Sequence, residues 1–299
     1  MGVLLAGETA DEEDAKVAAY SAVVPLQVVD VHRVRLKRTS RFSHQNLAQI
    51  LREAPGLSQW IPDSGEYLIA GRWRHRDEIV SVLEVTTGPN ALRLIGHLVE
   101  AAAVQGKRLV VVTEQHERRS PLFYHEAGMT LLEQILVYEA VIFGLPPGVP
   151  SLRFERVNKD DPFAMGELLE LDHQAFSWLW RNSADEFAEY LSDPRVDVYL
   201  GRDSCGQAMS YVGITRMRGW GHLDRLAVAP AAQGEGYGRE SLEWAVRVLG
   251  SRGARRVALS TQARNARSRR LYERFGFRRA PAFDYDIYGR WLGDPVPIE

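Results

Sequence analysis

The stretch "LAVAPAAQGEGYGRESL", residues 226–242, joins an apolar strand pattern to a glycine-rich loop and then to a helical pattern. Pro230 ends the strand that starts at His222, because proline cannot donate a ladder hydrogen bond. In "QGEGYG", residues 233–238, the glycines allow the backbone to approach a ligand closely. The first N–H groups of the helix that follows have no partner inside the helix and can bind an anion. The stretch therefore predicts a strand–loop–helix unit that can hold a phosphate group.

This loop differs from two familiar phosphate-binding motifs. No Gly-Lys-Ser/Thr follows it, so it is not a P-loop. Arg239 occupies the position of the third glycine in the dinucleotide-binding fingerprint, so the loop does not fit that motif well either. Taken alone, the loop is as consistent with a flexible turn as with a phosphate site, and the rest of the chain is needed to distinguish them.

The C-terminal half alternates strand patterns with helical patterns. Strand patterns are short apolar or alternating runs bounded by turn residues, whereas helical patterns repeat apolar residues every three or four positions. The expected strands span 152–157, 196–200, 209–215, 222–230, 255–261 and 282–288, and the expected helices span 163–176, 239–249 and 266–276. Strands that alternate with helices indicate a mixed sheet with helices packed on it.

The N-terminal half repeats the same order of elements. The expected strands span 66–74, 78–86, 108–113 and 131–143, and the expected helices span 91–104 and 118–128. When residues 108–129 are laid on residues 256–277 without a gap, Thr113, Arg119, Ser120, Tyr124 and Gly128 meet Thr261, Arg267, Ser268, Tyr272 and Gly276. We therefore predict an internal duplication with a proline- and glycine-rich linker at 144–151.

Composition limits the classes of protein to which the chain can belong. It has 299 residues, 45% of them hydrophobic and 25% charged, which suits a globular protein of about two domains. The net charge of -2 and the lack of a long apolar run argue against nucleic-acid and membrane partners. Cys205 is the single cysteine, so no internal disulfide forms, and we expect a cytoplasmic protein. Residues 1–25 are expected to form an extension with a helix beginning near Thr9.

The paired motifs of the C-terminal half resemble those of the GNAT acyltransferase superfamily. The first hallmark of that family is Arg/Gln-x-x-Gly-x-Gly/Ala after the fourth strand, and it is filled by Gln233, Gly236 and Gly238. The second is an asparagine followed by a helix with Leu-Tyr and a closing Gly-Phe, filled by Asn265, Leu271, Tyr272, Gly276 and Phe277. The resemblance covers about residues 152–290.

The resemblance implies an α/β (α+β) fold made of two tandem GNAT-like domains. Each domain would be a mixed, mostly antiparallel, splayed sheet with helices on both faces. The first would span 26–143 as a degenerate copy, and the second would span 152–299 as the catalytic copy. The tandem plan and the length are also similar to those of mycothiol synthases, although no residue indicates their amino-sugar substrate.

The resemblance further implies acetyl-CoA, or another acyl-CoA, as the co-substrate, and no metal. The pyrophosphate would lie on the backbone N–H groups of the glycine-rich loop, and the pantetheine arm would pair with the end of the preceding strand. The implied cofactor-binding residues are Leu226, Ala227, Val228, Gln233, Gly234, Glu235, Gly236, Tyr237, Gly238, Arg239, Asn265, Ser268 and Arg270. Most of the other arginines between 252 and 279 are expected to form a solvated helix face.

The implied reaction is direct transfer of the acyl group to an amine. A primary amine has an ordinary pKa of about 10, so it arrives protonated and a base has to accept a proton. His222 and Asp224 are two residues apart on one expected strand, so both point to one face. In the superfamily the base often lies at these positions. The residues leave open which of the two is the base, and whether both simply form a polar strand face in water.

Four aromatic residues are further candidates for the site. Tyr272 is the candidate general acid, because the leaving thiolate needs a proton, and the alternative is a half-buried tyrosine of the core. Trp178, Trp180 and Trp220 are candidates for contact with the acceptor, and core packing explains them equally well. Neither paired cysteines nor a His-Glu-x-x-His motif indicates a metal site.

The N-terminal copy lacks the features of the phosphate loop. Four residues are missing there relative to the other copy, and the remaining "TGPNAL" contains Pro89, which removes an N–H donor. Glu117 stands where the C-terminal copy has Asn265, and the positions of the base pair hold Glu78 and Val80. We therefore predict that this copy binds no CoA.

The favoured function is an N-acetyltransferase that acts on a small-molecule or peptide amine, as a monomer or a homodimer. Two alternatives stay open. One is a sensor or scaffold that binds acyl-CoA without catalysis, and the other is an acetyltransferase whose N-terminal half binds a protein or tRNA acceptor. Tyr272 and the His222–Asp224 pair favour catalysis over sensing.

Overall fold

The computed structural model describes residues 22–115, 119–142 and 151–297 of the chain. The helix expected to begin near Thr9, Glu117 and residues 144–150 of the expected linker lie outside these ranges. Within them, no helix combines the length and the apolar character that crossing a membrane requires.

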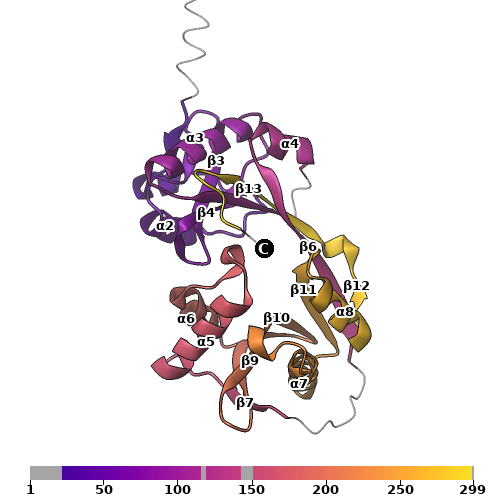
Figure 1. The fold of residues 1–299 in the computed structure, drawn as a ribbon. Coiled ribbons are helices and arrows are strands. Elements are labelled where there is room, and N and C mark those ends of the chain that lie inside the picture. The colour runs from indigo at the N-terminus through magenta and orange to yellow at the C-terminus, as the bar shows by residue number, and fades with distance from the viewer. Residues whose placement is uncertain (1–21, 116–118, 143–150, 298–299) are drawn as a thin grey trace, which may run out of the picture.

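The N-terminal half starts with short elements that the sequence patterns did not indicate, and then follows the predicted order (Figure 1). The helix α2 begins after Ser43, whose hydroxyl accepts a hydrogen bond from the N–H of Asn46. The elements are β1 (Val24–Pro25), η1 (Val28–Arg33), α2 (His44–Glu53), β2 (Gln59–Ile61), β3 (Glu66–Trp73), β4 (Arg76–Val85), α3 (Ala91–Val104), β5 (Leu109–Glu114), α4 (Pro121–Glu126) and β6 (Thr130–Val141).

The C-terminal half also follows the predicted order, with α6 as an additional helix. The side chains of Asp161, Ser183 and Asn265 cap α5, α6 and α8 by accepting backbone N–H bonds. The elements are β7 (Arg153–Arg156), α5 (Pro162–Ala175), η2 (Trp178–Trp180), α6 (Ala184–Ser192), β8 (Val196–Arg202), β9 (Ala208–Met217), β10 (Trp220–Val228), η3 (Pro230–Ala232), α7 (Tyr237–Ser251), β11 (Arg256–Gln262), α8 (Ala266–Phe275), β12 (Arg278–Arg279), η4 (Pro281–Phe283) and β13 (Tyr285–Trp291).

The strands of both halves belong to one sheet. In the described parts of the chain, its order is β1-β2-β3-β4-β5-β13-β6-β11-β10-β9-β8-β7, and β12 pairs with β6. The pairs β4–β5 and β10–β11 are parallel, and the other pairs are antiparallel. Residues 220–223 of β10 pair with 256–259 of β11, and beyond them the two strands diverge. The prediction of a mixed, mostly antiparallel and splayed sheet is therefore confirmed.

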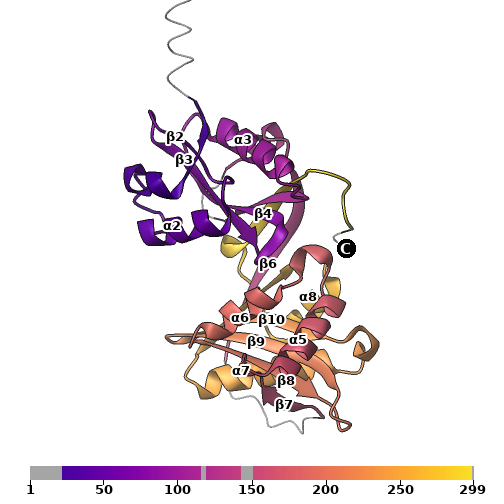
Figure 2. The ribbon, with the colours of Figure 1, turned by 90° about the vertical axis from the view of Figure 1, so that its left-hand side faces the viewer.

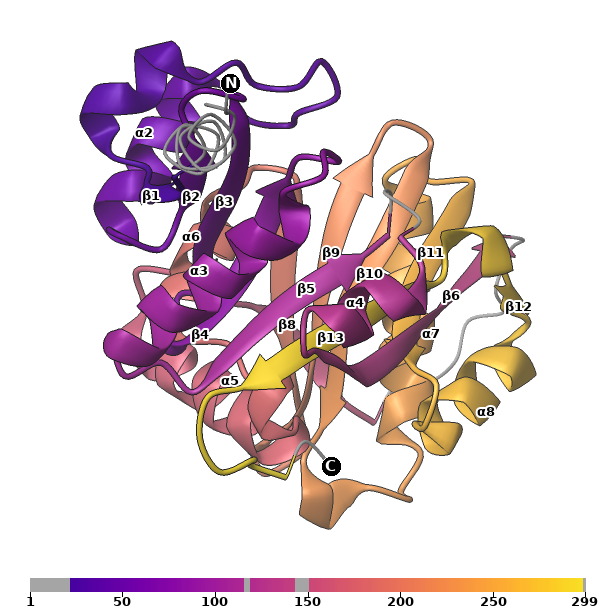
Figure 3. The same ribbon diagram turned by 90° about the horizontal axis from the view of Figure 1, so that it is seen from above.

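The two halves exchange strands. The last strand, β13, does not complete the sheet of the C-terminal half, because it pairs with β5 and with the first part of β6. The second part of β6 pairs in turn with β11 of the other half. Figures 1 and 3 show β6 passing from one half into the other with β13 beside it. The halves are thus consecutive along the sequence, but the part of the sheet in each half includes a strand, or part of a strand, from the other half.

Helices cover both faces of the sheet in each half. In the C-terminal half, α5 and α6 lie on one face and α7 lies on the other (Figure 2). Tyr211 packs toward α5 and α6, whereas its neighbour Val212 packs toward α7, as the alternation of a strand requires. In the N-terminal half, Leu68 packs with α3 and Ile69 packs with α2. An apolar cluster that contains Ile79, Leu109, Val111, Ile135, Leu179, Trp180 and Ile287 joins the halves.

Candidate active site

A pocket of about 840 Å³ lies where β10 and β11 diverge. The end of β10 forms one wall through Leu226, Ala227 and Val228. The last residue of α5, Ala175, and the two residues after it, Phe176 and Ser177, form another wall. The rest of the lining comes from the glycine-rich loop, the end of β11 and the first turns of α8, namely Gln233, Gly234, Gly236, Gly238, Arg239, Gln262, Arg264, Asn265, Arg267, Ser268 and Leu271.

The glycine-rich loop has the backbone geometry that its sequence predicts. Gly234 and Gly236 have φ values of 107° and 90°, a left-handed region that other residues rarely adopt. Gly236 is the N-cap of α7 and makes no side-chain capping bond. The N-terminus of α7 therefore points into a loop where an anion can serve as its cap. Arg239 and Arg267 add positive charge to the same wall of the pocket.

The first turn of α8 lines the pocket beside the glycine-rich loop. The carboxamide oxygen of Asn265 accepts the N–H of Ser268 at 3.0 Å, and both residues line the pocket. The side chain of Arg267 donates to the side-chain oxygen of Gln233, which links α8 to the glycine-rich loop. Of the described residues that the sequence assigned to the cofactor, Glu235, Tyr237 and Arg270 lie outside the lining.

A β-bulge in β10 follows the polar pair His222 and Asp224. The register with β9 shifts between Leu223 and Arg225, so Gly221 and Leu223 face α7, whereas Arg225 and Ala227 face α5. Asp224 lies at the shift and turns toward α6, where the hydroxyl of Tyr190 donates to its Oδ2. Asp224 thus shares the α5 and α6 face with His222 by ordinary strand alternation, and the bulge brings Arg225 to that face as well.

His222 and Asp224 contact each other directly. The distance from Nδ1 of His222 to Oδ1 of Asp224 is 2.7 Å. The other carboxylate oxygen accepts hydrogen bonds from Tyr190 and, at 2.6 Å, from Thr215. Burial and the carboxylate both raise the pKa of Tyr190, so its hydroxyl stays a donor. With Nδ1 donating to the carboxylate, Nε2 of His222 is left as a proton acceptor.

Tyr272 lies in the core between α8 and the sheet. Its side chain is only 6% exposed, and its ring lies 6.1 Å from those of Tyr138 and Phe277. Burial raises the pKa of Tyr272 to about 12, against a smaller opposing effect of its hydrogen bond with Ser268. Among the described residues of α8, its neighbours Ser268 and Leu271 line the pocket, and Tyr272 does not.

The tryptophans have separate environments. Trp178 stacks on Trp291 at 5.5 Å, and the guanidinium of Arg76 lies 4.5 Å from its ring. Trp180 is buried and lies 6.0 Å from Trp73 of the N-terminal half. Both therefore pack between the halves. Trp220 is exposed at the start of β10.

Residues 164–277 match the family model described as the Acetyltransferase (GNAT) family. A stretch of 57 residues is also 47% identical to a mycothiol acetyltransferase from Beutenbergia cavernae. That stretch covers 19% of this chain and 19% of that relative, so the two are compared over about a fifth of their lengths.

Two solved structures share the fold along nearly the whole chain. A tandem GNAT protein from the clavulanic acid biosynthesis pathway is 13% identical, with a TM-score of 0.59, over 92% of this chain and 100% of that one. A GCN5-related N-acetyltransferase from Sphaerobacter thermophilus is 15% identical, with a TM-score of 0.60, over 93% and 97%. The Acetyltransferase (GNAT) family model thus matches the C-terminal half, and the whole chain shares its fold with a tandem GNAT protein.

Several residues of this site could not be identified from the sequence. Tyr190 and Thr215 reach Asp224 from α6 and β9, and contacts of that range leave no mark in local spacing. Glu133 of the N-terminal half is 3% exposed and pairs with Arg264, which lines the pocket. The sequence does show Glu133 as an acidic residue within an apolar strand pattern, and that position could have marked it as a candidate. In the described ranges, no group of three or more His, Cys, Asp or Glu could hold a metal.

The corresponding region of the N-terminal half has different contacts. The carboxylate of Glu66 accepts the backbone N–H of Asn90, the N-cap of α3, at 3.1 Å. A Cβ built on Gly88 would lie 2.0 Å from the same carboxylate, so Glu66 occupies the region that corresponds to the phosphate loop. Arg119 donates to the backbone oxygen of Thr86 at 2.9 Å, at the end of β4. A pocket of about 350 Å³ remains beside these residues.

Proposed function

We propose that the C-terminal half transfers the acetyl group of acetyl-CoA to a small-molecule or peptide amine. The observation that carries this proposal is the His222–Asp224 contact on β10, just before the stretch of that strand that lines the pocket. A histidine oriented by a carboxylate is a suitable base for a protonated amine. A sensor that binds acyl-CoA without catalysis would not need such a base.

The residues of the pocket fit an acyl-CoA. A helix N-terminus, two arginines and left-handed glycines suit a pyrophosphate, and the diverging strands leave backbone groups of Leu226–Val228 for an amide-containing arm. The bound acetyl-CoA would supply the acetyl thioester. Leu226–Val228 follow His222 and Asp224 on β10, so one strand would hold both the amide-containing arm and the base.

The reaction that these residues support balances in protons and bonds. The neutral amine nitrogen forms a bond with the acetyl carbon, and the carbon–sulfur bond breaks. His222 accepts the extra proton of the ammonium form, directly or through a water, which leaves the neutral amine for attack, while Asp224 holds its Nδ1–H and stabilises the charged ring. Tyr272, next to the lining residue Leu271, keeps its hydroxyl proton at neutral pH and gives it to the leaving sulfur, and the second proton that the nitrogen loses as the amide forms returns to Tyr272.

We also propose that the N-terminal copy does not bind acyl-CoA. This is supported by Glu66 at the N-terminus of α3, by Arg119 on the last carbonyl groups of β4, and by Pro89 in the shortened loop. A carboxylate in that position repels a pyrophosphate and takes the N–H group that would bind it.

The experiment is a thiol-release assay on the full-length protein with acetyl-CoA and a panel of primary amines, together with calorimetry. We expect thiol release that depends on the amine, and one acetyl-CoA site per chain. Acetyl-CoA binding without thiol release for any small amine, peptide, protein or tRNA would support a sensor. Two sites per chain would contradict the proposal for the N-terminal copy.

A further inference from the structure

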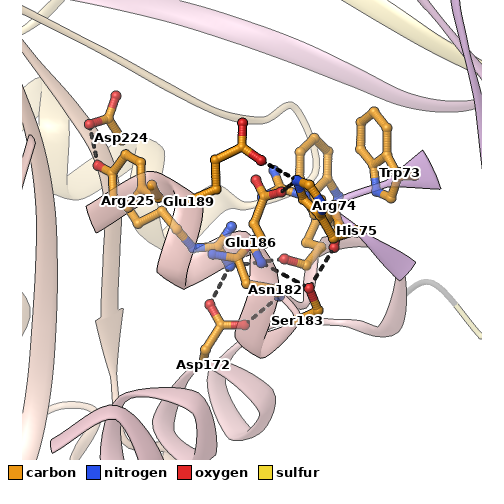
Figure 4. Close-up of polar contacts among 12 residues, drawn as sticks. Trp73, Arg74, His75, Asp172, Asn182, Ser183, Glu186, Glu189, Asp224 and Arg225 are labelled. Atoms are coloured by element: carbon orange, nitrogen blue, oxygen red, sulfur yellow. Dashed lines mark hydrogen bonds and ion pairs between the residues drawn. The ribbon is translucent and has the colours of Figure 1, made fainter. Parts of the chain in front are cut away.

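The hairpin between β3 and β4 of the N-terminal half contacts the segment before α6 of the catalytic half (Figure 4). The indole N–H of Trp73 donates to the backbone oxygen of Leu179 at 2.8 Å. The next residue, Arg74, donates from Nη1 to the side-chain oxygen of Asn182 at 2.6 Å, and its own carbonyl accepts the hydroxyl of Ser183 at 2.9 Å. The hairpin is thus bonded to three residues of one short segment.

The tip of the hairpin has an unusual backbone. Arg74 and His75 have φ values of 52° and 53°, in the left-handed region that residues other than glycine seldom adopt. Such backbones persist where the surroundings hold them, and they gather at functional sites. Here the surroundings include Glu189, whose carboxylate lies 2.6 Å from Nε2 of His75, and Glu186, which lies 3.9 Å from Nη1 of Arg74.

A chain of contacts leads from Arg74 to the base. Ser183 is the N-cap of α6, and its hydroxyl oxygen accepts the N–H of Glu186 at 3.0 Å. A hydroxyl has one proton, and because that proton goes to the carbonyl of Arg74, the lone pairs are turned toward α6. The same helix carries Tyr190, which donates to the carboxylate that holds His222. The position of α6 therefore governs the position of the base.

We propose that Arg74 is a positioning residue for acetyl transfer, through which the N-terminal half fixes the start of α6 and so the Tyr190–Asp224–His222 chain. This inference rests on the proposed function. A helix of nine residues has little stability of its own, so its placement depends on its cap and its tertiary contacts. Arg74 supplies both a carbonyl to the cap and a guanidinium to the residue before it.

Holding the halves together does not require Arg74. The exchanged strands β6 and β13 and the apolar cluster around Trp180 already join them. The environment of Arg74 is also unfavourable for a residue that would only hold the halves together. Burial and the nearby charge of Arg225 disfavour its charged form and lower the pKa of Arg74 to about 10. Its contact with Asn182 is better explained by a role in orienting α6.

The wall of the pocket should survive the loss of Arg74. Asn182 donates its backbone N–H to Asp172 at 2.8 Å, but Asp172 also accepts from Arg225 and Tyr211, both at 2.5 Å. The guanidinium of Arg225 lies 3.9 Å from the ring of Phe176, which lines the pocket. These contacts remain without Arg74, so acetyl-CoA binding should be preserved while turnover falls.

The test compares Arg74→Gln with wild type in the full-length protein. We expect kcat for thiol release to fall about tenfold or more, because a small misplacement of a reacting group has effects of this size. We expect the dissociation constant of acetyl-CoA, measured by calorimetry, to change by less than about twofold. Arg74→Lys, which can still donate to Asn182, should recover a large part of kcat. The matched control is Arg72→Gln, because Arg72 pairs with Asp77 inside the same hairpin at 3.2 Å.

Two results would overturn the inference: an unchanged kcat in Arg74→Gln, or equal losses in Arg74→Gln and Arg72→Gln. Should Arg74→Gln be insoluble, Ser183→Ala tests the same chain from the catalytic half and has to lower kcat with acetyl-CoA binding intact. Failure of the proposed function is seen separately, because the wild-type protein itself would then release no thiol with any amine.

Discussion

Replacing Asp224 by asparagine keeps the size of the side chain and removes its charge. In the structure one carboxylate oxygen lies 2.7 Å from Nδ1 of His222, and the other accepts from Tyr190 and Thr215. A hydrogen bond to a charged group contributes about 1.5–3 kcal/mol, and the charged imidazole formed during transfer loses that partner. Since 1.36 kcal/mol corresponds to a tenfold change in rate, we expect kcat to fall roughly 10- to 150-fold.

The assay is the initial rate of thiol release at saturating acetyl-CoA and amine. The dissociation constant of acetyl-CoA should stay near the wild-type value, because Asp224 is not among the residues that line the pocket. Asp160→Asn, at an exposed position, is the matched control. His222→Gln should reduce kcat at least as much as Asp224→Asn if histidine is the base. An unchanged kcat in Asp224→Asn, or a larger loss there than in His222→Gln, would refute the reasoning.

Three further changes have defined outcomes. Tyr272→Phe should lower kcat about 100-fold through loss of the general acid, without weakening acetyl-CoA binding in calorimetry, and an unchanged kcat would remove Tyr272 as the acid. Gly236→Ala should weaken acetyl-CoA binding, because an L-residue at a φ of 90° costs about 1–2 kcal/mol although its Cβ meets no atom; wild-type affinity would show that the loop tolerates the strain. Asp172→Ala should lower the free energy of unfolding by about 3–5 kcal/mol in urea titration, because Arg225 is left as a buried unpaired charge, and a loss under 1 kcal/mol would contradict this pairing.

Local sequence patterns were sufficient for the elements that build the pocket. The glycines of 233–238, the apolar strand before them and the capping asparagine at 265 each have a short-range physical reason, and the structure brings them together. The pair His222 and Asp224 was also accessible, because two positions on one strand share a face.

Contacts between distant segments were not accessible in this way. The patterns of β6 and β13 indicate strands but do not say which edges they complete, since pairing partners are set by the whole sheet. The helix α6 and its Tyr190 were missed, because a short helix is defined by its tertiary contacts more than by its own periodicity. The sequence drew attention to Trp178 and Trp180 as aromatic residues. Their packing between the halves could not be predicted, because it depends on the same long-range arrangement.

The exchange of strands also sets the order in which a newly made chain can finish folding. The place between β5 and β6 is filled by β13, whose first residue, Tyr285, is synthesised about 140 residues after Val141, the end of β6. At a synthesis rate of about 5–20 residues per second, the gap stays open for roughly 7–30 seconds. During that time two strand edges are exposed to neighbouring nascent chains. Pairing of one chain's β6 with another chain's β13 would produce a domain-swapped dimer.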